Sequence, residues 1–222
     1  MDNWRTDWAR TKRDVALRLS SKECGGSYAE AVIILCALIS AMAAEVWPGR
    51  GKDRKRFIEV LVQFAPSNLN TRRISIPLLV KSLREESRTS ESNSLEKTYL
   101  DYSRTQVLTG DQVDKFEEEI ICKCPSLKLK EIRDCSYGSL LYEEIRSAYA
   151  HEYHPGSRAD SSPLTCIRTA AVSYVNWVDD IDRHIYFHVQ WIADVSIAIT
   201  EVIDASKTTL PRVDPLKWWV DG

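Results

Sequence analysis

Hydrophobic residues in this chain recur mostly at the three- and four-residue spacing of amphipathic helices. At the start of the chain this period predicts a helix over residues 3–20. Its apolar stripe is Trp4, Trp8, Val15 and Leu19, and we expect that stripe to face the core. The basic residues of the same segment lie mostly off the stripe and form a solvated face.

The most apolar segment is the uncharged run Ala31–Ala44. At roughly 14 residues it is too short to span a bilayer, so it predicts a buried core helix. Ser27 and Glu30 have the spacing of a capping box, and Pro48 follows at the other end. The expected helix therefore covers residues 28–47 at the centre of the fold.

Shorter amphipathic segments follow this run. They predict helices over residues 54–65 with Asp53 as the cap, 76–86, 112–122 opened by a capping box from Thr109 to Gln112, and 189–206. The polar stretch 87–94 predicts a mobile loop.

Residues 172–187 break the helical period. β-branched and aromatic residues on both sides of Asp179–Arg183 predict a small β-hairpin before the last helix. In the tail, residues 207–222, the pair Trp218 and Trp219 is too apolar to be left free, so we expect it to pack on this chain or on a second subunit.

Composition fits one mainly α domain over residues 1–222. The chain is 44% hydrophobic and 28% charged, which is typical of a soluble globular protein. A net charge of −2 argues against nucleic-acid binding by bulk electrostatics but allows a small basic site. The first twenty residues are charged and contain no secretory signal, and the six cysteines show no C-x2-C pair. These features predict reduced thiols, a cytoplasmic location, no structural metal and no membrane span.

The candidate chemistry lies between residues 138 and 156. Ser136 or Ser139 can cap a helix there, and Pro155 ends it before His154. Near its end come Arg146, Ser147, His151 and Tyr153. No other stretch places a cation, an imidazole and a phenol so close together on a helix end.

Arg146 and His151 are five residues apart, which is roughly 140° around a straight α-helix. A site that uses both side chains therefore needs a frayed helix end or a second copy of the chain. A two-fold axis would bring two arginines and two histidines into one cleft.

Other interpretations of these residues remain open. Arg183 and His188 have the same spacing in a β-like stretch without the tyrosine. If the first match is accidental, Arg146 is a surface arginine that pairs with Glu143 or another acid. His184 and His188 could bind a metal only on a helix, and a hairpin would separate them.

The sequence Arg146-SerAlaTyrAla-His151-Glu-Tyr153 resembles the Arg-x4-His-x-Tyr signature of HEPN ribonuclease domains, and is most similar to that of HEPN toxins from toxin–antitoxin pairs. About 100 residues carry the resemblance: the central apolar helix and the motif helix. Residues 50–125 would then be a helical insertion in an all-helical bundle. Ser147 follows the arginine, at a position that is polar in many members of the family.

The resemblance implies a homodimeric, metal-independent endoribonuclease without a cofactor, acting as a toxin or antiviral effector. His151 would be the general acid or base, and Arg146 would bind the phosphate. In the toxin pairs a partner nucleotidyltransferase antitoxin can modify the motif tyrosine, here Tyr153. The alternative is a HEPN-like module that binds RNA or a nucleotide without cutting it.

Basic residues outside the motif give weaker candidates for RNA contacts. They are Arg54 and Lys55 in a dense positive run, and Arg158 in the loop after the motif.

Overall fold

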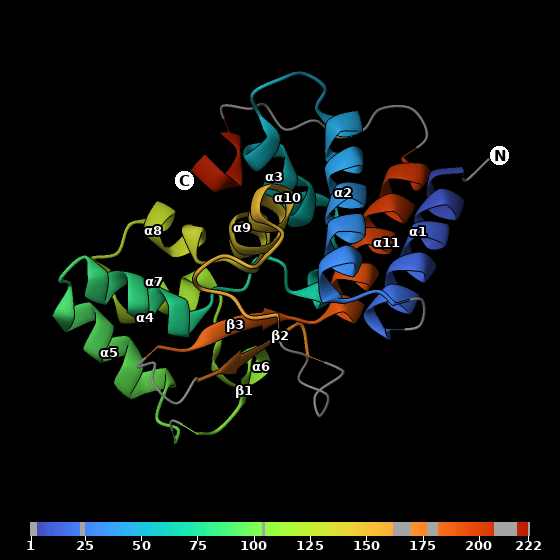
Figure 1. The fold of residues 1–222 in the computed structure, drawn as a ribbon. Coiled ribbons are helices and arrows are strands. Elements are labelled where there is room, and N and C mark those ends of the chain that lie inside the picture. Colours follow the sequence, from blue (N-terminus) through green and yellow to red (C-terminus); the bar gives the residue numbers. More distant parts are fainter. Residues whose placement is uncertain are drawn as a thin grey trace.

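The computed structural model describes residues 4–22, 25–103, 105–161, 170–176, 182–206 and 217–221. The fold is mainly helical with one small antiparallel sheet, which confirms the predicted fold class (Figure 1). Helices gather around two hydrophobic clusters, a larger one that contains the central apolar helix and a smaller one farther along the chain.

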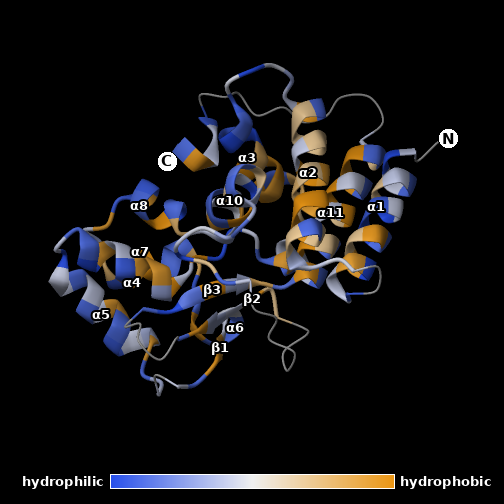
Figure 2. Ribbon diagram, in the orientation of Figure 1, coloured by the Kyte–Doolittle hydropathy of each residue, from blue (hydrophilic) through white to orange (hydrophobic). Residues whose placement is uncertain are grey.

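The larger cluster is built around α2 (Tyr28–Val46), which lies between α1 (Trp4–Ser20) and α11 (Val189–Ala205) on one side and α3 (Asp53–Phe64) on the other (Figure 1). Figure 2 shows α2 as the most continuously hydrophobic helix of the group. By length and composition α2 could cross a membrane, yet half of its apolar window is buried within this fold. It is therefore the core helix that the sequence predicted.

The start of α2 carries the predicted capping box. The backbone N–H of Ser27 donates to Glu30 at 2.8 Å, and the N–H of Ala29 donates to the Ser27 hydroxyl at 3.2 Å. These bonds satisfy backbone donors that have no partner within a helix, so the helix starts at the position that the sequence specified.

The outward face of α1 corrects one prediction. Trp4 and Trp8 were expected in the core, but they are 55% and 37% exposed. The buried face of α1 consists instead of small residues, Thr6, Ala9 and Ala16. Small side chains allow α1 to approach α2 and α11 closely, and this close packing outweighs burial of the large aromatic rings.

The smaller cluster joins α4 (Ile76–Glu85), α5 (Thr89–Tyr99), α7 (Glu117–Lys123) and α8 (Leu129–Asp134). The predicted loop 87–94 is wrong, because α5 covers most of it. α5 packs on α4 and buries Leu95 and Ser92 completely, so tertiary packing overrides the polar local sequence.

Two predicted helix starts also differ from the structure. The expected helix 112–122 is divided into α6 (Gly110–Val113) and α7, since Asp114 between them turns inward and accepts hydrogen bonds from Tyr137 and Tyr174 at 2.6 Å each. Asp53 is the first residue of α3 rather than its cap, and no side chain caps that helix.

The sheet confirms the predicted hairpin. It has the order β1-β2-β3, with β1 (Leu108–Thr109), β2 (Val172–Val175) and β3 (His184–Phe187) all antiparallel. Val172 lies opposite Phe187 in the register. Residues 177–181, which connect β2 and β3, lie outside the described residues.

The described part of the tail packs on the chain, as expected for the tryptophan pair. Trp218 is 4% exposed and contacts Trp47 edge-on, and a short 3₁₀ turn, η4 (Trp219–Asp221), follows it. The buried carboxylate of Glu59 accepts the N–H of Val220 at 2.9 Å. Another 3₁₀ turn, η1 (Ser67–Leu69), follows α3, and residues 207–216 lie outside the described part.

Candidate functional site

The motif lies on a helix made of three continuous parts. α9 (Tyr137–Leu140) leads into the π-helix η2 (Leu141–Ser147), and α10 (Ala148–Glu152) completes it. Ser136 caps the start, since its hydroxyl accepts the N–H of Ser139 at 3.2 Å. The helix ends where predicted, at Tyr153 in the left-handed conformation with φ of 59°.

The π-helix includes Arg146 and Ser147. Each π-type hydrogen bond spans five residues rather than four, so this segment turns less per residue than an α-helix. Only the first step from Arg146 toward His151 lies in this segment, and α10 covers the rest, so the separation of roughly 140° expected for a straight helix still holds approximately. Short π-helical segments are frequent at functional sites, and this one lies within the candidate motif.

Glu144 holds the loop after the motif against the π-helix. The residue is 6% exposed, and its carboxylate accepts from Arg158 through Nε at 2.6 Å and through the backbone N–H at 3.1 Å. Its carbonyl accepts the N–H of Gly156 at 2.8 Å. A Cβ on Gly156 would collide with the Glu144 carboxylate, so glycine is needed for this close approach.

Arg146 is half-buried, and within the described residues it makes no ion pair. Its guanidinium carbon lies 5.3 Å from the centre of the Tyr142 ring. The acid that could have neutralised it, Glu143, instead accepts from Arg54 at 2.5 Å. A positive charge thus remains uncompensated on the motif helix. Burial raises the pKa of the Cys36 thiol on α2 to about 12, and Arg146 is close enough to oppose that shift.

His151 is exposed on the last turn of α10, and Ser147 is half-buried four residues before it. Across the described ranges neither side chain makes a hydrogen bond, and His151 makes no ion pair. The imidazole is therefore accessible to a substrate or to a second subunit.

Tyr153 connects the end of the motif to the start of α2. Its hydroxyl donates to the Glu30 carboxylate, and its side chain is 58% exposed. Hydrogen bonds, first from the Ser27 hydroxyl and then from Tyr153, lower the pKa of Glu30 to about 2. The same contact raises the pKa of Tyr153.

Each of the three basic residues that are weaker candidates for RNA contacts, Arg54, Lys55 and Arg158, is paired with a carboxylate. Arg54 donates to Asp134 at 2.9 Å as well as to Glu143, and Lys55 donates to Asp221 at 3.0 Å. Arg158 is held by Glu144. The contacts leave these cations less available for phosphate than Arg146, and their role in RNA binding stays a prediction.

The second Arg–His match does not form a comparable site. His188 is buried, its Nε2 lies 2.8 Å from the Ser173 hydroxyl, and burial lowers its pKa to about 4. Arg183 donates to the carbonyls of Ser103 and Gln106. In the part of the chain that the structure describes, no group of three or more His, Cys, Asp or Glu residues could hold a metal ion.

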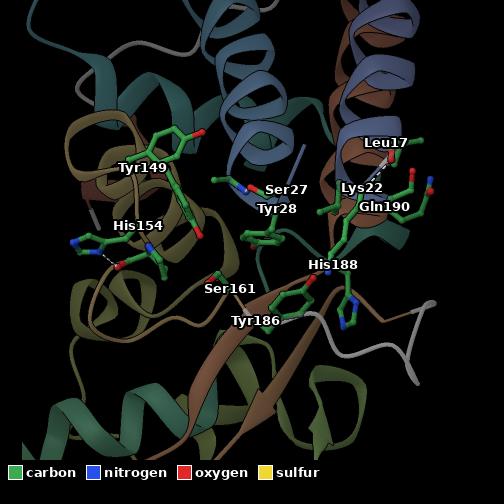
Figure 3. A pocket seen from close by; sticks show the side chains of 16 residues that line it. Leu17, Lys22, Ser27, Tyr28, Tyr149, His154, Ser161, Tyr186, His188 and Gln190 are labelled. Carbon is green, nitrogen blue, oxygen red and sulfur yellow. Dashed lines mark hydrogen bonds between the residues drawn. The ribbon is translucent and has the colours of Figure 1, made fainter. Parts of the chain in front are cut away.

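A groove that no pattern in the sequence indicated lies beside the end of the motif. It has a volume of about 790 Å³, and its walls include Tyr28, Tyr149 and Tyr186 (Figure 3). These tyrosines come from distant parts of the chain, so no local spacing in the sequence could have indicated that they meet. Tyr153 and His154 line the same groove, which places it against the motif.

Comparison with known proteins gives no relative: no family model, no curated protein and no solved structure matches the chain.

Proposed function

We propose that this protein is a metal-independent endoribonuclease of the HEPN type that acts as a homodimer in the cytoplasm. The observation that carries the proposal is the state of the motif cation. Arg146 lacks an acidic partner among the described residues, whereas the nearby Arg54 and Arg158 are both paired. An unneutralised arginine and an accessible imidazole on one helix are suited to a phosphodiester once a second subunit brings the two groups into one cleft.

The reaction is an internal transesterification. His151 takes the proton from a ribose 2′-hydroxyl, and the 2′-oxygen forms a bond to the adjacent phosphorus. Arg146 donates to the phosphate oxygens as negative charge increases on them. The bond from phosphorus to the 5′-oxygen then breaks, and an imidazolium protonates that oxygen. The products carry a 2′,3′-cyclic phosphate and a 5′-hydroxyl.

A dimer provides both proton-transfer groups. One imidazole accepts the first proton, and a second imidazole in the same cleft can donate to the leaving oxygen. A two-fold contact between motif helices supplies that second copy of His151. The exposure of His151 agrees with such a contact.

Regulation belongs to the same proposal. A ribonuclease toxin needs restraint, and the exposed hydroxyl of Tyr153 is the group that a nucleotidyltransferase antitoxin would modify. The alternative function is a HEPN-like module that binds RNA or a nucleotide without cleavage. It is favoured by the same free cation, because binding a phosphate needs Arg146 but does not need His151.

Cleavage of a mixed RNA pool without divalent metal tests the proposal. We expect wild-type protein to release fragments with cyclic-phosphate ends and His151→Ala to be inactive. Glu152→Ala, which changes an exposed neighbour on the same turn, is the matched control and should retain activity. A folded, dimeric wild-type protein that binds the pool without cutting it would support the binding module, and equal cleavage by His151→Ala would reject His151 as the catalytic group.

A further inference from the structure

The groove beside the motif, which we call the tyrosine groove, lies where several helices begin or end. The end of α1, the starts of α2 and α11, and the residues after α10 all contribute to its walls. Figure 3 shows Lys22 and Gln190 on one side of the groove and Tyr149 and His154 on the other.

Aromatic rings form much of the groove. Tyr28 lies between the other two, with ring centres 6.0 Å from Tyr149 and 5.2 Å from Tyr186. The His188 ring stands edge-on to Tyr186 at 5.0 Å. The three tyrosines are only 4–9% exposed, so a small part of each ring lines the groove and gives it an apolar, aromatic wall.

The polar part of the groove favours an anion. Lys22 supplies a positive charge. Ser20, Ser21 and Ser27 also line the groove, but their hydroxyls already donate within the chain, to the carbonyls of Leu17 and Arg18 and to the Glu30 carboxylate, so Lys22 is the donor that an anion would meet. No carboxylate is among the described residues that line it. Asp160 is close enough to raise the pKa of Tyr186, but its side chain is buried and is not part of the wall.

Hydrogen-bond donors are also left over at the start of α11. His188 occupies the cap position, but no side chain caps this helix, because the imidazole contacts Ser173 instead. Val189 and Gln190, in the first turn of this 17-residue helix, line the groove. Free backbone donors at a helix start favour negative charge.

Tyr186 adds an independent indication of a ligand. The residue is only 5% exposed, yet its hydroxyl has no hydrogen-bond partner in the described structure. The hydroxyl is not among the fully buried atoms that lack a partner, so it reaches the groove, where a ligand can form a hydrogen bond with it.

We propose that the tyrosine groove binds one nucleotide unit, with the base against Tyr28 and Tyr186 and the phosphate near Lys22 and the start of α11. The unit is either part of a single-stranded RNA or a free nucleotide, since both present the same chemistry. If the unit is part of an RNA, the proposal rests on the proposed function. The groove would then be a subsite that positions the RNA strand relative to Arg146 and His151. Contact of a base with an aromatic wall does not depend on the edge of the base, so such a subsite tolerates any base.

The groove can sense or position RNA because its rim belongs to the motif. Tyr153, His154 and Pro155 line it and directly follow the turn that carries His151. A nucleotide bound there lies against the same segment that holds the imidazole. Occupation of the groove therefore affects the position of the end of the motif helix.

Binding is measured with His151→Ala protein, so that RNA is not cut. The probes are a short fluorescent single-stranded RNA and, in parallel, the four nucleoside 5′-monophosphates. Lys22→Glu should weaken binding about tenfold by reversing the charge at the phosphate. Tyr186→Phe keeps the ring and its packing and should weaken binding about fivefold by removing the hydroxyl. Lys12→Glu makes the same charge change on the exposed face of α1, away from the groove, and should bind as its parent does.

The outcomes separate the ligand and the function. Loss of affinity for RNA alone identifies a segment of RNA as the occupant, and an equal loss for the monophosphates identifies a free nucleotide. Unchanged affinity of both variants, or no binding by the parent protein, overturns the proposal. If the wild type cleaves RNA but the groove variants bind as well as their parent, the groove proposal is rejected and the ribonuclease proposal stands. If binding depends on the groove but the wild type does not cleave RNA, the ribonuclease proposal is rejected and the groove proposal stands for a free nucleotide.

Discussion

The hydroxyl of Tyr153 donates to the carboxylate of Glu30, and this contact joins the end of the motif helix to the start of α2 across 123 positions of sequence. Glu30 also completes the capping box of α2 through Ser27. One carboxylate thus serves two helix ends. The segment that carries His151 is thereby connected to α2, the apolar core helix of the larger cluster.

Replacing Tyr153 with phenylalanine should separate this positioning role from stability. We expect RNA cleavage to fall several-fold, while the free energy of unfolding stays nearly unchanged because the contact is exposed. The pKa of Glu30 should rise from about 2 toward its ordinary value, though not fully, since Ser27 remains. Kinetics, denaturant unfolding and NMR titration measure these effects. Tyr102→Phe, at another exposed tyrosine, is the control, and wild-type cleavage by Tyr153→Phe would contradict the positioning role.

The ion pair of Glu144 and Arg158 should be more costly to break than that of Arg54. Arg158→Ala leaves a buried carboxylate without its cation and should reduce the free energy of unfolding by about 3 kcal/mol. Arg54→Ala breaks pairs with Glu143 and Asp134, whose side chains are 39% and 42% exposed, and should cost about 1 kcal/mol or less. Denaturant unfolding of both variants tests the order, and equal losses would show that burial of Glu144 does not determine the energy.

Asp114 should make stability depend on pH. Burial raises its pKa from 3.8 to about 7, so between these values the folded protein holds a proton that the unfolded chain releases. Stability from this group is complete below about pH 4 and decreases as the pH rises to about 7, by at most ~1.4 kcal/mol per pH unit. Asp114→Asn should remove this component.

The measurement is denaturant unfolding at about pH 5 and about pH 8, expressed as the difference between variant and wild type. The difference is necessary because His188 acts in the opposite direction: its pKa is lowered to about 4, so its contribution is lost as the pH falls below about 6.5. Asp111→Asn, at an exposed carboxylate on the short helix α6 that Asp114 follows, is the control. An identical pH profile for Asp114→Asn and wild type would exclude a protonated Asp114.

Mixing two inactive variants tests whether the site is shared between subunits. Arg146→Ala and His151→Ala should each be inactive, but a heterodimer contains one intact arginine and one intact histidine. If the two come together across the two-fold axis and the single imidazole acts first as base and then as acid, a mixture refolded at equal concentration should recover up to about a quarter of wild-type activity. Recovery is measured by RNA cleavage, with each variant alone as the control. A mixture as inactive as its components would place both residues of a site on one chain or require both copies of each.

Local signals in the sequence predicted the helix ends that local chemistry determines. The capping box of Ser27 and Glu30 and the stop before His154 depend on neighbours in sequence, and both were found. The loop expected around Ser92 was wrong because α4 supplies the burial that the local sequence lacks. The hydrophobic period predicted that Trp4 would face the core. Trp4 is exposed instead, because the face of α1 that packs closely on its neighbours carries small residues such as alanine.

The candidate site was only partly predictable. The spacing of Arg146 and His151 identified the segment, but which arginine stays unpaired depends on acids from other elements. Glu143 contacts Arg54 across 89 positions of sequence. The tyrosine groove also depends on contacts between residues that are far apart in the sequence. Neither the spacing of residues nor the composition can predict such contacts.

The π-helix makes the direction of the motif depend on chain length. A π-helix contains one residue more than an α-helix with the same number of hydrogen-bonded turns. Deletion of a single residue at the start of Leu141–Ser147 would restore ordinary winding and rotate everything after it by roughly 100°. Arg146 and His151 would then turn together toward another part of the surface, with their side chains and their spacing unchanged. A one-residue deletion would therefore redirect the motif without altering its chemistry, which no substitution can do.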